Sequence, residues 1–141
     1  MKTLQESIIG RKGVPHSNRI ELPDPKKMDL KHLDVLVCRN EEVYICLDQR
    51  ECLHNLTKYL ERWGKCFDAY EYDPGRDKVY PLGLENYDTE LKCRNNRPYD
   101  IIHVYRGMLD DVEDCDMPVI WKTLEKRIEN IKSLLKLILC R

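Results

Sequence analysis

The sequence lacks the short motifs that identify the common enzyme classes. It contains no G-x-S-x-G nucleophile elbow, no G-x-x-x-x-G-K-S/T phosphate loop, no H-E-x-x-H zinc motif and no G-x-G-x-x-G dinucleotide fingerprint. None of its seven cysteines forms a C-x-x-C pair, and its four histidines are dispersed. We therefore expect no cofactor and no metal site built from cysteine or histidine.

The sequence also lacks a long apolar run and a strong charge of either sign. No stretch of about 18 apolar residues is present, so we expect no membrane partner. The formal net charge is −1, which gives no overall attraction to nucleic acid or to an acidic membrane. The chain starts without an apolar export signal and the number of cysteines is odd, so we expect reduced thiols in the cytoplasm or nucleus.

What is present is typical of one globular domain. The 141 residues are 42% hydrophobic and 35% charged, and a chain of this length can bury a sizeable core. Residues 1–27 contain two glycines and three prolines without a sustained period, so we expect a flexible basic arm there. Residues 28–141 should form a single α+β domain.

The pattern of apolar residues predicts six strands and two helices. Residues 33–39 and 42–47 are β-rich and apolar on both faces, which is typical of strands inside a covered sheet. Asp48 and Glu51 have the spacing of a capping box and begin a predicted helix over residues 48–64. Further strands are predicted at 67–73, 78–82, 88–94 and 100–106, and a long helix at 118–140. The order β-β-α-β-β-β-β-α predicts an antiparallel sheet of five or six strands with a helix packed on each face.

The last helix carries the strongest indication of function. A heptad stripe of apolar residues runs from Trp121 to Ile138, and three leucines widen it until the last turn is apolar nearly all round. Such a surface is normally covered, either by the chain's own sheet or by a second copy. We therefore predict a non-catalytic regulatory protein that acts through protein–protein contacts, as a homodimer and with a protein partner. The predicted interface is Trp121, Leu134, Leu137 and Leu139.

A parallel pair of these helices is disfavoured, because it would set Arg127 against Lys132 of the partner. The helix then packs either across its own sheet or antiparallel against a copy. Leu137 and Leu139 lie off the heptad stripe and should face the partner, whereas Leu135 should face the chain's own core.

A nucleic-acid-binding protein is the first alternative. Residues 8–13, IIGRKG, resemble the G-x-x-G loop with which KH domains grip single strands. In that family the loop lies inside the fold, whereas here nine residues precede Gly10 and Pro23 interrupts the following helix. We interpret the stretch as part of the arm. The basic residues available for phosphates are Arg11, Lys12, Arg19, Lys26 and Lys27 in the arm and Lys122, Lys126 and Lys136 in the last helix.

A metal-dependent nuclease is the second alternative. The stretch YDTELKCR places Glu90 and Lys92 on one face of a predicted strand, with Asp88 beside them. Together with Asp68 or Asp73 upstream, they could form the set of carboxylates and lysine that holds Mg²⁺ in E-x-K nucleases. The same alternation of polar and apolar residues is also typical of any half-exposed strand.

Overall fold

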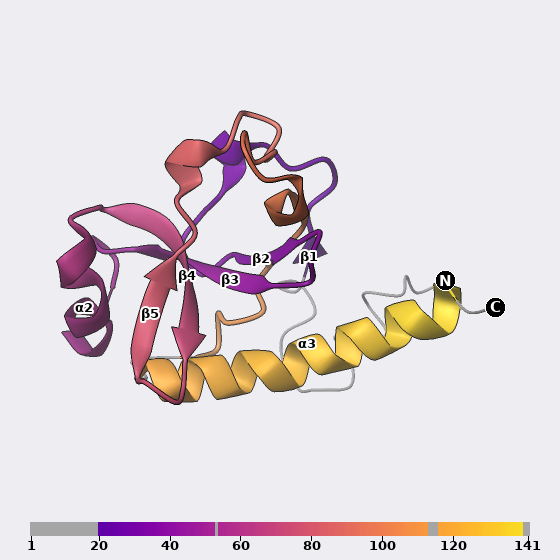
Figure 1. Cartoon of the computed structure of the whole chain (residues 1–141). Coiled ribbons are helices and arrows are strands. Elements are labelled where there is room, and N and C mark those ends of the chain that lie inside the picture. The colour runs from indigo at the N-terminus through magenta and orange to yellow at the C-terminus, as the bar shows by residue number, and fades with distance from the viewer. Residues whose placement is uncertain (1–19, 53, 113–115, 140–141) are drawn as a thin grey trace.

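A computed structural model describes residues 20–52, 54–112 and 116–139, with the backbone alone for Ile20, His54 and residues 129–139. Six antiparallel strands form one sheet in the order β1-β6-β2-β3-β4-β5 (Figure 1). The strands are β1 (Ile20–Glu21), β2 (Val35–Cys38), β3 (Val43–Asp48), β4 (Phe67–Asp73), β5 (Lys78–Pro81) and β6 (Ile101–Arg106). Within the described ranges, the α-helices are α2 (His54–Leu60) and α3 (Met117–Leu139), and the 3-10 turns are η2 (Lys27–Asp29), η3 (Glu61–Trp63), η4 (Leu84–Asn86) and η5 (Arg97–Tyr99). The predicted α+β class with an antiparallel sheet is confirmed.

The central strands are buried on both faces, as their continuous apolar runs predict. Val35 and Val37 of β2 belong to one core cluster, whereas Leu36 and Cys38 belong to the other. This split follows from the alternation of side chains along a strand. The sheet therefore separates two cores rather than covering one.

The two α-helices of the described part pack on the same face of the sheet, so the prediction of a helix on each face is not confirmed. Leu56 and Leu60 of α2 and Ile120 and Leu124 of α3 share one core cluster. The opposite face is covered by short turns between β5 and β6, which bury Leu84, Tyr87 and Leu91. The helical periodicity of a segment shows that one side of the helix must pack against an apolar surface. It does not show which face of the sheet supplies that surface.

The predicted strand over residues 88–94 is also wrong. The Asp88 carboxylate accepts hydrogen bonds from the backbone N–H groups of Glu90 (2.8 Å) and Lys92 (3.0 Å), which closes a turn. Leu91 has a φ of 63° and is buried, so the chain reverses there instead of extending. A short polar residue that binds its own backbone stabilises such a turn.

Two predicted boundaries lie elsewhere in the structure. Residues 20–27 are already part of the fold, because Glu21 pairs with Tyr105 and the Lys27 N–H donates to the Thr89 carbonyl oxygen at 3.0 Å. Residues 20–27 therefore do not belong to a separate arm, and residues 1–19 lie outside the described part. The helix α2 begins at His54 rather than at Asp48, which is the last residue of β3.

The helix α3 covers the sheet with its first half. Met117, Ile120, Leu124 and Ile128 are buried at helical spacing. Its yellow C-terminal half continues past the sheet (Figure 1). None of the helices in the described part of the chain combines the length and apolar character needed to cross a membrane.

Candidate interaction groove

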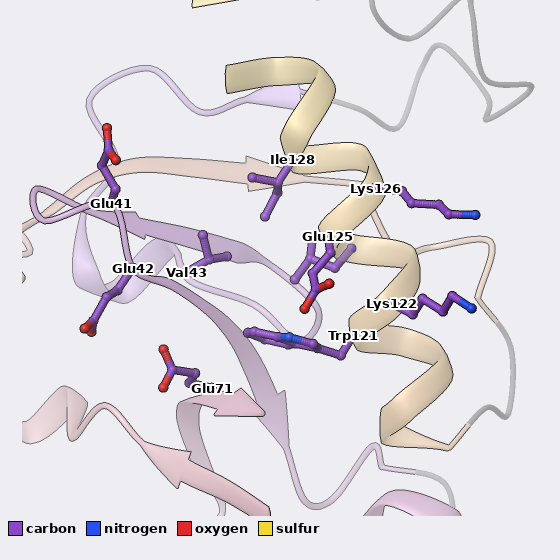
Figure 2. A pocket seen from close by; sticks show the side chains of 10 residues that line it. Glu41, Glu42, Val43, Glu71, Trp121, Lys122, Glu125, Lys126 and Ile128 are labelled. Carbon is purple, nitrogen blue, oxygen red and sulfur yellow. The ribbon is translucent and has the colours of Figure 1, made fainter. Parts of the chain in front are cut away.

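An open groove of about 540 Å³ runs between α3 and the hairpin that joins β2 to β3 (Figure 2). Residues from three stretches of the sequence form its walls, and we call it the acidic groove. Its lining residues are Glu41, Glu42, Val43, Glu71, Trp121, Lys122, Leu124, Glu125, Lys126 and Ile128.

The floor of the acidic groove is apolar. Leu124 and Ile128 are buried, and Val43 and Trp121 are half-buried beside them. The Trp121 ring meets Tyr72 of β4 at 6.4 Å between ring centroids with a 62° interplanar angle. Edge-to-face contacts of this kind stabilise aromatic pairs beyond the area that they bury.

A second contact fixes Tyr72 beneath Trp121. The Asp77 carboxylate accepts hydrogen bonds from the hydroxyl groups of Tyr72 (2.5 Å) and Tyr59 of α2 (2.8 Å). Burial and this hydrogen bond raise the pKa of Tyr72 to about 12, so its hydroxyl remains a donor. The aromatic floor is therefore held from both α2 and the β4–β5 hairpin.

The wall formed by the strands is acidic. Burial raises the pKa of Glu71 above its usual value, and the neighbouring carboxylates of Glu42 and Asp73 raise it further. Glu42 accepts a hydrogen bond from the Tyr44 hydroxyl at 2.7 Å. Within the described ranges, Glu71 and Glu125 make no ion pair, so their charges are available to a cationic ligand.

The two lysines of the lining do not neutralise this wall. Lys122 and Lys126 are exposed, and Figure 2 shows their side chains directed away from the strands, whereas Trp121, Glu125 and Ile128 point toward them. The space between helix and hairpin is thus apolar at its floor and negative at its rim. Such a surface fits a partner that is apolar and basic.

Trp121, one of the four predicted interface residues, lines this groove. The side chains of Leu134, Leu137 and Leu139 lie outside the described part. Sequence reasoning did not identify the acidic wall, because Glu42 and Glu71 are 29 positions apart and meet only through the pairing of β3 with β4.

The candidate nuclease residues are not brought together. Asp73 accepts the Gly75 N–H (3.0 Å) in the β4–β5 hairpin, while Glu90 forms an ion pair with Lys26. Asp88 caps the turn that contains Glu90 and Lys92. In the described part of the chain, no group of three histidine, cysteine or acidic side chains is placed to hold a metal ion.

The candidate nucleic-acid residues are divided between the two faces of the sheet. Lys26 pairs with Glu90, and the Lys27 ammonium donates to the Tyr87 carbonyl oxygen at 3.0 Å. Tyr87 belongs to the core cluster opposite α3, so these lysines lie on the other side from Lys122 and Lys126. Arg11, Lys12, Arg19 and the Lys136 side chain lie outside the described part.

Comparison of the chain with protein-family models, with curated proteins and with solved structures found no match.

Proposed function

We propose that this chain is a small, non-catalytic interaction protein that pairs with a second copy of itself through α3. The observation that carries the proposal is the extension of α3 beyond the sheet (Figure 1). Residues 131–139, which we call the C-terminal segment, contain six leucines and isoleucines, two lysines and no acidic residue. A helix with this composition is stabilised when another surface covers it.

The size of the effect is sufficient for association. Burying one leucine or isoleucine contributes about 1.5–3 kcal/mol. Two or three such side chains on each of two chains can offset the entropic cost of pairing and leave a dissociation constant of roughly micromolar order. The residues proposed for this contact are Trp121, Leu134, Leu137 and Leu139.

We also propose that the protein works in a reducing compartment, cytoplasm or nucleus. Cys38 and Cys46 are buried in β2 and β3, where burial raises the pKa of Cys38 to about 12 and that of Cys46 well above its usual value. Both thiols are therefore protonated at neutral pH and act as small core residues. This supports a packing role for these cysteines.

Sedimentation velocity between roughly 1 and 100 micromolar, a range around the expected affinity, tests the proposal. The wild type should shift from monomer to dimer, and the double variant Leu137→Glu/Leu139→Glu should remain a folded monomer. Val119→Glu is the matched control, because Val119 is 51% exposed in the first half of α3 and does not line the acidic groove. A wild type that is monomeric throughout this range overturns the proposal.

A further inference from the structure

We propose that the acidic groove is the binding site for the C-terminal segment of a second copy. This inference rests on the proposed self-association and names the surface that receives the helix end. The groove presents four glutamates around an apolar floor, and only Lys122 and Lys126 oppose them, from its outer side. Its chemistry calls for a ligand with aliphatic and cationic side chains.

The C-terminal segment has this chemistry. It carries Lys132 and Lys136 among its six aliphatic residues, and Arg141 follows it. The nearest acidic residue before it is Glu129, so the last twelve residues of the chain contain three cations and no anion. Aliphatic side chains can cover the groove floor while the cations meet the glutamates at its rim.

The segment cannot fill the groove of its own chain. The lining residues Trp121 to Ile128 and the C-terminal segment belong to one continuous helix, Met117–Leu139. Ten residues along a helix correspond to about 15 Å, and a helix does not fold back on itself. The occupant must therefore come from another molecule.

In a dimer, the acidic groove of each copy can be filled by the C-terminal segment of the other. If two α3 helices lie antiparallel and cross near residue 130, residues 131–139 of one copy run along residues 121–129 of the other. The two stretches have equal length, about 13.5 Å at 1.5 Å per residue. A two-fold axis makes the contact reciprocal, so each groove receives one helix end.

Two charge reversals test this arrangement in the full-length protein. Glu71→Lys/Glu125→Lys reverses the groove, and Lys132→Glu/Lys136→Glu reverses the segment. Each variant alone should keep the wild-type circular dichroism spectrum and dimerise at least about tenfold more weakly, because like charges then face each other in both contacts. In a 1:1 mixture every contact again joins opposite charges, so heterodimers should form with near wild-type affinity.

The outcomes separate this inference from the proposed self-association. If the wild type dimerises but the groove reversal leaves its affinity unchanged, or the mixture gains no heterodimer, the groove assignment is overturned while the dimer stands. The other basic stretch of the chain is tested by Arg11→Glu/Lys12→Glu/Arg19→Glu. If this variant dimerises more weakly while Lys132→Glu/Lys136→Glu does not, residues 11–19 rather than the C-terminal segment occupy the acidic groove. That result also overturns the inference. A monomeric wild type removes both proposals.

Discussion

Arg106 of β6 binds Asp29 and Asp34 near the start of the described fold, and replacing it should destabilise the domain. Its guanidinium donates from Nε to Asp34 Oδ1 at 3.0 Å and from Nη2 to Asp34 Oδ2 at 2.8 Å. It also donates to the Asp29 carbonyl oxygen at 2.7 Å. Asp29 ends η2 and Asp34 directly precedes β2, so this one side chain ties both segments to β6.

The expected loss follows from the burial of Asp34, which is 1% exposed. Removing one partner of a buried ion pair leaves an uncompensated charge and costs about 3–5 kcal/mol. The Arg106 side chain is 32% exposed, so water reaches part of the site and reduces this cost. We expect Arg106→Ala to lower the free energy of unfolding by about 2–3 kcal/mol, and Arg106→Lys by about half as much because a lysine cannot form the two-pronged contact.

Urea unfolding at one fixed protein concentration measures these losses, since dimerisation would otherwise contribute to stability. Using the Leu137→Glu/Leu139→Glu background removes that contribution. Asp34→Asn/Arg106→Ala is the decisive control, because an uncharged amide no longer leaves a buried charge unpaired. This double variant should lose less stability than the sum of its two single variants. A loss below about 1 kcal/mol for Arg106→Ala, or strict additivity, refutes the reasoning.

Two further predictions concern a titrating side chain and a glycine. His32 Nδ1 accepts a hydrogen bond from the Asp48 N–H at 3.0 Å, and burial lowers the pKa of His32. The unfolded chain therefore protonates His32 more readily than the folded chain does. The free energy of unfolding should fall as the pH drops through about 6.5, the usual pKa of histidine. The amide oxygen of the His32→Asn variant can replace the Nδ1 acceptor but does not titrate, so the stability from urea unfolding should depend less on pH. Equal pH dependence in the wild type and the variant would show that His32 is not the titrating group. Gly83 has a φ of 80° and an added Cβ would lie 2.9 Å from Asn86 Nδ2, so Gly83→Ala should cost about 1–2 kcal/mol in thermal unfolding. Gly75→Ala, where φ is ordinary and the nearest atom is 3.4 Å away, should stay within about 0.5 kcal/mol, and similar losses for both variants would contradict the role of φ.

Those parts of the fold that rest on local pattern could be predicted from the sequence. The apolar runs at β2 and β3 require cover on both faces, and Pro74-Gly75 marks the hairpin that joins β4 to β5. Residues 88–94 could not be assigned, because an alternating pattern arises both in a strand and in a turn closed by Asp88. The positive φ of Leu91 has no signature in a residue that favours extended or helical backbone.

The candidate site could be predicted only in its helical half. Trp121 stands out in a heptad stripe, whereas Glu42, Val43 and Glu71 have no common pattern in the sequence. They meet because β3 pairs with both β2 and β4, which brings the β2–β3 hairpin beside the acidic position of β4. Such pairing between distant strands depends on the whole fold, so the conformational preferences of neighbouring residues do not reveal it.

The structure also changes the reason for preferring an antiparallel pair of helices. From the sequence, a parallel pair is disfavoured by Arg127 facing Lys132, but the Arg127 guanidinium is held within its own chain by Asp111 at 2.8 and 2.9 Å. It is therefore not available for repulsion across a helix interface. The stronger argument is the position of the acidic groove beside the first half of α3. A parallel pair would place the two lysine-bearing segments together and leave both grooves uncovered, whereas an antiparallel pair sets each segment against the opposite charge. Because these charges lie at an exposed rim, raising the ionic strength from roughly 0.05 to 0.5 M should weaken an antiparallel dimer, and should strengthen a parallel one.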